Sequence, residues 1–528
     1  PLLPISAAQR PMAVPAEPDR ARSLAFRARP ERRRQIARVT KTSAPTAPLA
    51  APPPATADLP FSALEDGVQE IVARLRPLWE APETLPVRST VRPGAIRDAL
   101  PAMAPVEGET LRAILDDLDR IVLPGITHWN HPGFLAYFSI SSSIPSILAE
   151  LLVAGLNTNG MLWVTSPAAT ELEQVVTRWL WDAMGLADGA ARFGMLTDTA
   201  SISTLLGLAA AREATGLDVR GEGLAGRDLP RLRTYCSAHA HSSVDKACLT
   251  LGLGAANVVK IACDDAYRMR PDALAAAIAA DRAAGHRPMA IVATVGTTSI
   301  ASVDPVPAIA DVAEREGCWL HVDAAYAGVT AIAPEFRWAM AGVERADSVV
   351  TNPHKWLFTT VDCSAVWTRR PEVLRRAFSL VADYLVTGAD AEVVNYMDYG
   401  VQLGRRFRAL KLWMVMRAFG TSGLAARLRA HCALAREFAA WIGATPGWRV
   451  VAPVEFSLVC FRYEPESMGE AEADAENMRI METVNASGAV YLSHTKLSGR
   501  VVLRVAIGNV RTAREHVRRA YELLVGAV

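Results

Sequence analysis

The sequence predicts an α/β fold with a mostly parallel central sheet. Short runs of β-branched and aromatic residues alternate with longer helical segments through the middle of the chain. Strands that are separated by helices need crossover connections, and crossovers join parallel strands. With 528 residues, of which 51% are hydrophobic, the chain is long enough for several domains and a large core.

We divide the chain into four parts. Residues 1–57 are dense in Pro, Ala and Arg, and we expect a disordered extension because they offer few large apolar side chains. Residues 58–135 form a predicted N-terminal helical segment, in which apolar residues recur at three- and four-residue steps. A large domain, residues 136–430, holds the predicted sheet. A small C-terminal α+β domain covers residues 431–528.

The predicted strands of the large domain are short and rich in β-branched residues. They cover residues 232–236, 258–262, 290–295, 319–323, 348–351 and 364–367. Residues 271–284 and 305–316 read as intervening helices, and 458–462 and 501–506 as strands of the C-terminal domain. Residues 144–156 form the longest apolar run, but it is too short to span a bilayer and carries Glu150. We interpret it as a buried helix.

Charge and cysteine usage exclude several classes of protein. The formal net charge is only +1, which argues against nucleic acid or an anionic membrane as a partner. The seven cysteines are scattered without a Cys-x-x-Cys pair, so we expect a reduced, cytoplasmic protein with no structural metal. His128 and His131 lack the acidic or cysteine partners of a metal site. The N-terminal extension has no apolar centre typical of a secretory signal, although its arginines weakly resemble a transit peptide.

Four polar residues fall at or just after the ends of predicted strands: His241, Thr298, Asp323 and Lys355. In an α/β sheet the carboxyl ends of the strands form the edge where ligands bind. Each residue alone has an ordinary explanation, such as a core histidine, a capped strand end or a solvated lysine. Their common placement predicts an active site at this edge.

A small polar loop leads into an alanine- and leucine-rich helix at Thr199, Ala200 and Ser201. Unpaired backbone N–H groups at a helix N-terminus bind anions, so a phosphate would fit there. The alternative is simple N-capping by Thr199 or Ser201.

Together these features match the needs of pyridoxal 5′-phosphate. Lys355 would take the cofactor's aldehyde, and residues 199–201 its phosphate. Asp323 would keep the pyridine nitrogen protonated, and His241 would stack on the ring. Asp323 and Lys355 are 32 residues apart. This spacing is close to the roughly 30 residues of one strand-helix-strand unit, so both residues could face one ligand.

At these residues the chain resembles the group II pyridoxal phosphate-dependent decarboxylases, in particular the aromatic-L-amino-acid decarboxylases. The resemblance extends from about Phe61 to Val528. The matching segments are PGITHWNHPGFLAYF, TSPAATELE, DTASISTLLGLAAAR, AHSSVDKA, ATVGTTS, WLHVDAAYAG, NPHKWL and LGRRFRALKLW. This resemblance implies a fold-type I homodimer whose active sites contain residues of both subunits.

The resemblance also implies roles for individual residues. It assigns the covalent bond to the cofactor to Lys355, the pyridine nitrogen to Asp323 and the stacking position to His241. The remaining implied cofactor contacts are Ala200, Ser201, Thr298, Asn352 and His354. A mobile loop would bring Tyr384 over the site to protonate the substrate carbon after carbon dioxide leaves.

The implied substrate pocket departs from that of the animal enzymes. Ile140 follows Ser139 where those enzymes have a Pro-Thr pair, and Asn159 and Met161 replace Ile and Phe. Gly404 matches a position where glycine tends to accompany indole substrates, and His241 also reaches the substrate. We expect decarboxylation of a tryptophan, tyrosine or phenylalanine-like amino acid to its amine. The alternatives are an aromatic aldehyde synthase, a decarboxylase of a non-aromatic substrate such as glutamate, and a non-catalytic binding protein.

Overall fold

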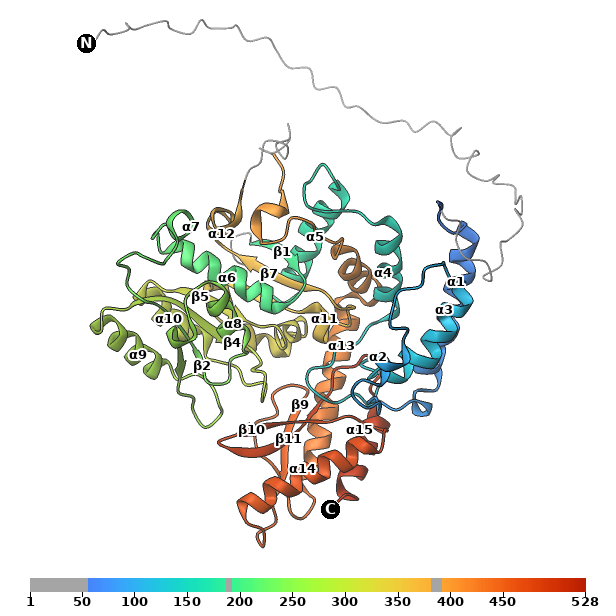
Figure 1. Ribbon diagram of the computed structural model, residues 1–528. Coiled ribbons are helices and arrows are strands. Elements are labelled where there is room, and N and C mark those ends of the chain that lie inside the picture. The colour runs from blue at the N-terminus through green and yellow to red at the C-terminus, as the bar shows by residue number, and fades with distance from the viewer. Residues whose placement is uncertain (1–55, 187–191, 381–391) are drawn as a thin grey trace, which may run out of the picture.

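The computed structural model describes residues 56–186, 192–380 and 392–528. Its central element is a seven-stranded sheet in the order β1-β7-β6-β5-β4-β2-β3 (Figure 1). The strands are β1 (Phe193–Thr197), β2 (Leu232–Ser237), β3 (Val258–Ile261), β4 (Arg287–Thr294), β5 (Trp319–Asp323), β6 (Ser348–Thr351) and β7 (Ser364–Thr368).

The sheet is mostly parallel, as the sequence predicts. Strands β3, β2, β4, β5 and β6 pair in parallel, whereas β7 runs antiparallel to both β6 and β1. The sequence prediction missed β1, because Phe193–Thr197 contains glycine and one β-branched residue and reads locally as part of a loop. Its pairing with β7, far along the chain, makes it a strand.

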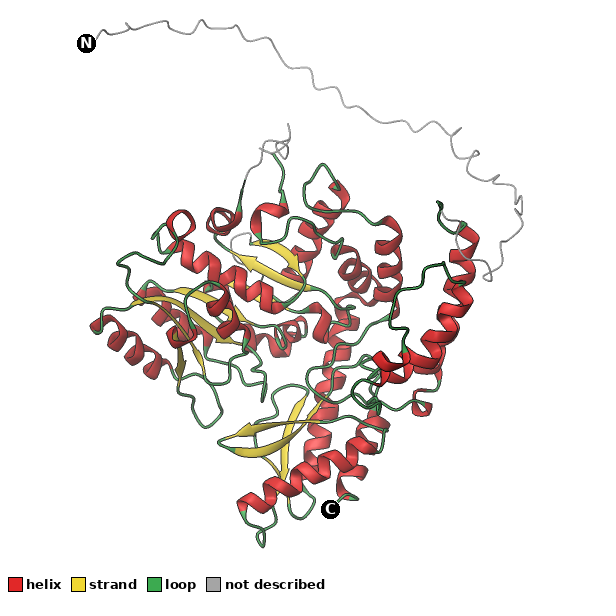
Figure 2. Ribbon diagram, in the orientation of Figure 1, coloured by secondary structure: helices red, strands yellow, loops and turns green. Residues whose placement is uncertain are grey.

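Helices cover both faces of this sheet (Figure 2). Along β4, Ala290 and Val292 pack in the cluster that contains α6, whereas Ile291 and Ala293 pack with α9 and α10. This alternation is the period of two expected for a strand that is buried on both faces. The helices of this region are α5 (Pro167–Ala183), α6 (Ala200–Ala214), α7 (Val219–Glu222), α8 (Ser243–Thr250), α9 (Pro271–Ala283), α10 (Val306–Glu316), α11 (Pro353–Trp356) and α12 (Pro371–Phe378).

The N-terminal segment is helical, as predicted, and lies along one side of the molecule (Figure 1). It contains α1 (Phe61–Glu80), α2 (Ala95–Ala99) and α3 (Leu111–Asp117), the last continued by a π-helical turn. Arg74 of α1 pairs with Asp119 at 3.0 Å. Arg511, near the C-terminus, donates to the carbonyl of Leu78, which ties α1 to the rest of the chain.

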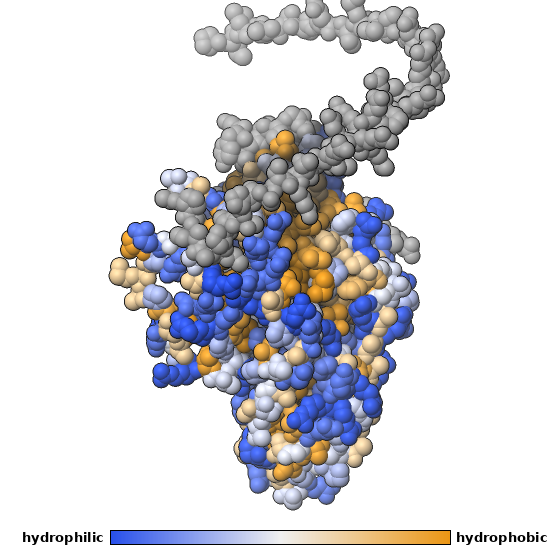
Figure 3. Space-filling view, turned by 90° about the vertical axis from the view of Figure 1, so that its right-hand side faces the viewer, coloured by the Kyte–Doolittle hydropathy of each residue, from blue (hydrophilic) through white to orange (hydrophobic). Residues whose placement is uncertain are grey.

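Helix α4 (Ile144–Leu156) has the predicted bounds, but it is not a buried helix. Its small residues Ser146 and Ala149 face inward, whereas Leu148 and Leu152 are 50% and 51% exposed. Hydrophobic side chains gather on the side of the molecule where α1 and α4 lie (Figure 3). The apolar run alone did not reveal which face of the helix is covered.

The C-terminal region is built on a four-stranded antiparallel sheet in the order β10-β11-β9-β8. Its strands are β8 (Trp448–Val450), β9 (Leu458–Tyr463), β10 (Ser493–Leu497) and β11 (Arg500–Ala506), and its helices α14 (Glu470–Ala486) and α15 (Arg514–Val525). The 35-residue α13 (Ala409–Gly443), which bends at Gly420, contacts elements of both regions. The predicted boundary at residue 431 therefore falls inside a shared helix.

Most of the predicted N-terminal extension, residues 1–55, lies outside the described residues. None of the described helices combines the length and apolar character needed to cross a membrane.

Candidate active site

A cavity of about 200 Å³ lies at the carboxyl edge of the central sheet. It is formed where β2, β4, β5 and β6 end and where α6 begins. All eight residues that the sequence and its resemblance assign to cofactor binding line this one cavity. They are Ala200, Ser201, His241, Thr298, Asp323, Asn352, His354 and Lys355.

Lys355 enters the cavity from α11, the short helix that follows β6. Pro353 occupies the first turn of this helix, where its missing N–H costs nothing. Burial lowers the pKa of the Lys355 ammonium, and the negative charge of Asp323 partly opposes this shift. A lowered pKa increases the fraction of neutral amine, which is the form that attacks a carbonyl group.

Asp323 is the last residue of β5, between β4 and β6, and its side chain is buried. Its Oδ1 accepts a hydrogen bond from the backbone N–H of Ala325 at 3.0 Å. A buried carboxylate at this position favours a cationic partner. A protonated ring nitrogen is such a partner.

His241 follows β2, and its ring is held in place by the backbone. Its Nδ1 accepts from the N–H of Ser243 at 3.1 Å, so the neutral ring carries its proton on Nε2. Burial lowers the pKa of His241; Asp323 raises it and Lys355 lowers it further. The ring at the cavity wall is therefore mainly neutral near pH 7 and has one N–H to donate.

The start of α6 forms the anion-binding end of the cavity. Ala200 and Ser201 are the first residues of this 15-residue helix, and their N–H groups have no partner within it. Thr199 makes no capping hydrogen bond through its side chain, so the simple N-capping interpretation is wrong for this residue. The helix start fits a phosphate group.

Two further atoms test whether a polar cofactor fits. Among the described residues, the buried Oδ1 of Asn352 and Oγ1 of Thr294 have no hydrogen-bond partner, and both residues line the cavity. Buried polar atoms are almost always paired in native proteins. A ligand with several polar groups, such as pyridoxal 5′-phosphate, would supply partners for them.

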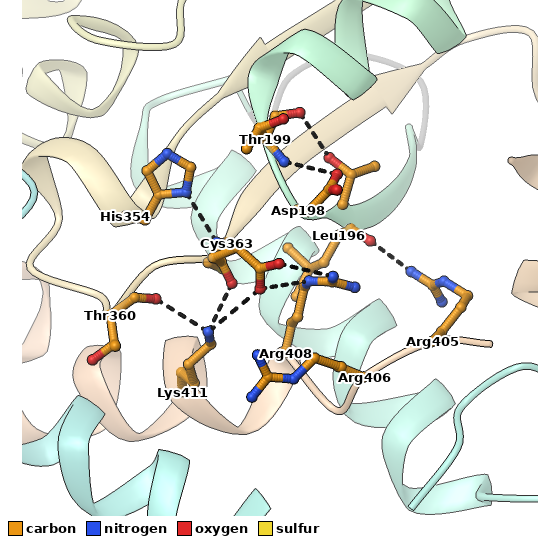
Figure 4. A network of polar contacts seen from close by, with 12 residues as sticks. Leu196, Asp198, Thr199, His354, Thr360, Cys363, Arg405, Arg406, Arg408 and Lys411 are labelled. Carbon is orange, nitrogen blue, oxygen red and sulfur yellow. Dashed lines mark hydrogen bonds and ion pairs between the residues drawn. The ribbon is translucent and has the colours of Figure 1, made fainter. Parts of the chain in front are cut away.

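His354 is connected through hydrogen bonds to a network of charged groups (Figure 4). Arg408 binds both carboxylate oxygens of Asp362 at 3.0 Å, and Lys411 donates to the backbone oxygen of Asp362 at 2.7 Å. The next residue, Cys363, donates its N–H to Nδ1 of His354 at 3.0 Å. Burial lowers the pKa of His354 to about 3, so the ring remains a neutral acceptor.

Sequence reasoning missed this network and part of the cavity wall. Arg408 and Lys411 lie in the LGRRFRALKLW segment. Basic residues at the start of an otherwise apolar helix could have indicated buried ion pairs there. Tyr326 also lines the cavity, and its ring stacks on that of Phe138 with 3.7 Å between centroids. The segment DAAYAG contains no pattern that predicts a place for Tyr326 in the cavity wall.

Of the predicted substrate residues, His241 lines this cavity, whereas Ile140, Asn159, Met161 and Gly404 do not. Oδ1 of Asn159 accepts from the N–H of Arg405 at 2.9 Å, and a Cβ on Gly404 would lie 3.7 Å from Nδ2 of Asn159. Met161 accepts from the N–H of Met397 through its carbonyl. Ile140 is partly buried and also lies outside the cavity lining. Asn159 and Gly404 are thus neighbours, but within one chain they form a separate group.

The predicted proton donor, Tyr384, lies outside the described residues. Its position relative to Lys355 stays a prediction.

Comparisons with known proteins identify the family of the chain. Residues 93–464 match the family model described as the pyridoxal-dependent decarboxylase conserved domain. Tyrosine decarboxylase 4 of Petroselinum crispum is 41% identical over 454 residues, covering 84% of this chain and 88% of the relative. Phenylacetaldehyde synthase of Arabidopsis thaliana is 41% identical over 450 residues, covering 84% and 91%. The crystal structure of Oryza sativa TDC with PLP and tryptamine superposes with a TM-score of 0.86 at 37% identity, covering 89% of this chain and 98% of that one.

Proposed function

The chain belongs to the family of pyridoxal-dependent decarboxylases, and we propose that its substrate is an aromatic L-amino acid of the tryptophan, tyrosine and phenylalanine class. It is a pyridoxal 5′-phosphate enzyme of fold type I. The products are the corresponding amine and carbon dioxide. The observation that carries this proposal is the meeting of Lys355, Asp323 and the start of α6 in one cavity.

Each residue of the cavity has a separate role in the proposed reaction. Pyridoxal phosphate, when bound, supplies an electron sink for the electron pair that remains on the substrate's α-carbon after carbon dioxide leaves. Asp323 would hold the ring nitrogen in its protonated form, and the N–H groups of Ala200 and Ser201 would hold the phosphate. Lys355, whose pKa burial lowers, would hold the cofactor through its amine and would supply a neutral amine close to the substrate.

His241 has a second role in this proposal. Its ring is neutral and its Nε2–H is available, since Nδ1 is occupied by the N–H of Ser243. It can therefore cover the face of the cofactor and donate to the substrate carboxylate. The resemblance assigns the final proton transfer, to the α-carbon, to Tyr384.

The wall of the cavity supports an aromatic rather than an acidic substrate. Phe138 and Tyr326 present stacked rings, and Lys355 is the only lysine or arginine in the cavity lining among the described residues. An acidic side chain would need a second cation there. The guanidinium of Arg504 lies 5.6 Å from the centre of the Phe138 ring. It donates to the carbonyls of Thr298 and Ser299, so these hydrogen bonds already engage it.

An aromatic aldehyde synthase is the second candidate. It is favoured by one observation: the Arabidopsis phenylacetaldehyde synthase is as similar to this chain as the parsley tyrosine decarboxylase. The presence of both Tyr384 and His241 favours the amine, because relatives that make aldehydes usually carry phenylalanine at the tyrosine or replace the histidine.

We further propose a homodimer with shared active sites. Asn159, Met161 and Gly404 resemble substrate-contacting positions, yet they do not line the Lys355 cavity of their own chain. A second copy would bring such residues to that cavity. The exposed apolar side chains of α1 and α4, such as Val72 and Leu148, would be covered at the same interface.

We also propose a cytoplasmic location, supported by the seven free cysteines.

A product assay on the purified protein tests the proposed function. The holoenzyme would be incubated separately with tryptophan, tyrosine, phenylalanine and glutamate while carbon dioxide, amine and aldehyde are measured together. We expect equal amounts of carbon dioxide and amine from at least one aromatic substrate and none from glutamate. Lys355→Ala serves as the control for background reaction. Aldehyde as the main product would favour the second candidate, and turnover of glutamate alone would reject both.

A further inference from the structure

A second cavity, of about 290 Å³, lies at the opposite edge of the central sheet from Lys355. It is lined by the first residues of β4 and β5, by residues after β7 and by the last turns of α6 and α10. It shares no lining residue with the catalytic cavity. At roughly 30 Å³ per water molecule, it has room for about ten waters or a small organic molecule.

Four arginines and two carboxylates line this cavity, and the carboxylates are already paired. Arg345 binds Glu314 at 2.6 Å and also Asp311 at 2.8 Å. Arg369 binds Asp347 at 2.9 Å. The acidic groups of the lining are therefore neutralised by these two arginines.

Of the other two arginines, Arg287 has no ion pair in the part of the chain that the structure describes, and Arg370 has one long ion pair with a residue outside the lining. Arg287 uses one N–H to donate to the carbonyl of Thr215 at 2.7 Å. The nearest carboxylate to Arg370 is that of Glu372, at 3.9 Å, which lies outside the cavity lining. A guanidinium group has five N–H donors in a fork that matches carboxylate and phosphate oxygens. Both groups keep donors for a ligand.

Trp319 gives the cavity a rigid apolar wall. Its indole N–H donates to Oγ of Ser348 at 2.9 Å, and the guanidinium of Arg370 lies 5.2 Å from the centre of its ring. The side chains of Pro288 and Met289 also line the cavity. The lining thus combines fixed apolar surface with two cations that have spare donors.

We propose that this cavity binds a small organic or inorganic anion with several negatively charged oxygens. Arg287 and Arg370 would hold these oxygens beside Trp319. Polycarboxylates and phosphates share this chemistry. The site is distinct from the active site, but β5 links the two, because Trp319 begins the strand and Asp323 ends it. The five residues of this strand span only about 13 Å.

Calorimetric titration of the holoenzyme tests this site. Citrate and pyrophosphate are the two probes, each compared with sodium chloride at equal ionic strength, and the change in the tryptophan fluorescence of the protein is followed in parallel. We expect saturable binding of one anion per chain for at least one probe, and the fluorescence change should vanish in Trp319→Phe. The probe that binds identifies the ligand as a carboxylate or a phosphate.

Variants of the two arginines locate the binding. Arg287→Met and Arg370→Met should each weaken the affinity by about tenfold or more. Arg287→Lys retains a donor for Thr215 and controls for the loss of that contact. Arg417→Met is a matched control, since the guanidinium of Arg417 lies 4.9 Å from the centre of the Trp413 ring but outside this cavity. Absence of saturable binding by both probes, or unchanged affinity in both methionine variants, would overturn the proposal.

Discussion

The indole N–H of Trp356 donates to Nδ1 of His431 at 2.9 Å, and the two ring planes lie within 1° of parallel. Both side chains are buried. Trp356 directly follows Lys355 in α11, whereas His431 comes from α13, 75 residues further along the chain. The bond therefore anchors the helix that carries the lysine to the helix that links the two regions of the molecule.

Replacing His431 with leucine should destabilise the protein. The indole N–H would be left buried without an acceptor, which costs about 1–3 kcal/mol. Urea denaturation measures the loss in the free energy of unfolding. His431→Gln retains an acceptor and should recover part of that loss; equal stability of the leucine variant and the parent would show that the bond contributes nothing.

Acid should destabilise the fold through its buried histidines. Burial lowers the pKa of His131, His321 and His431 to about 4, and that of His354 to about 3. The unfolded chain, with histidine pKa values of about 6.5, binds more protons than the folded chain below that pH. The free energy of unfolding should therefore fall between about pH 6.5 and pH 4, by up to about 1.4 kcal/mol per pH unit for each histidine.

Asp304 opposes this trend, because burial raises its pKa to about 6 and its contribution to stability is instead lost as the pH rises from about 4 to about 6. Urea midpoints measured across this range give the slope. His431→Gln should reduce the slope of the free energy of unfolding against pH. A free energy of unfolding that does not change with pH would contradict the prediction.

Replacing Asp323 with asparagine should impair the reaction more than the folding. A carboxylate about 4 Å from a cation at an effective dielectric constant of 20 contributes roughly 4 kcal/mol. Turnover should fall by up to about a thousandfold. The pKa of Lys355, which Asp323 raises, should fall further. Asp323→Glu retains the charge and is the matched control; the kcat and the pH dependence of the visible spectrum are measured for both. Normal kcat in the asparagine variant would exclude the assigned role.

Replacing Tyr384 with phenylalanine should change the product. Without the phenolic proton donor that the resemblance assigns to this position, we expect less amine and more aldehyde, ammonia and peroxide. The ratio of amine to aldehyde is measured by chromatography with an aromatic substrate. An unchanged ratio would remove Tyr384 from the role of proton donor.

The buried ion pair between Glu173 and Arg405 should contribute more to stability than an exposed pair. Oε1 of Glu173 accepts from Arg405 at 2.7 Å and from the N–H of Leu196 at 2.7 Å. Glu173→Gln should cost about 3–5 kcal/mol, because it leaves the buried guanidinium without its counter-ion. The exposed pair of Glu335 and Arg429 is the control, and Glu335→Gln should cost much less, because solvent screens an exposed ion pair. Chemical denaturation measures both; similar losses would contradict the difference in burial.

The sequence by itself determined the central architecture and the edge of the sheet where the site lies. The strands 319–323 and 348–351 have their predicted bounds, and His241, Thr298, Asp323 and Lys355 meet in one cavity. Such features are local, because hydrophobic periodicity marks the strands and the ends of parallel strands share one edge. Ala200 and Ser201, predicted from the start of a helix, line the same cavity, and the family resemblance added Asn352 and His354 to it.

Only the tertiary structure decided which distant side chains meet and which faces stay exposed. It paired Trp356 with His431, placed Arg408 and Lys411 behind His354 and brought Arg287 and Arg370 to a second cavity. It also left the apolar face of α4 uncovered within one chain, although the sequence predicted a buried helix. The physical reason is that periodicity records how often a chain alternates between apolar and polar residues. The partner of each side chain depends on how elements far apart in the sequence pack together.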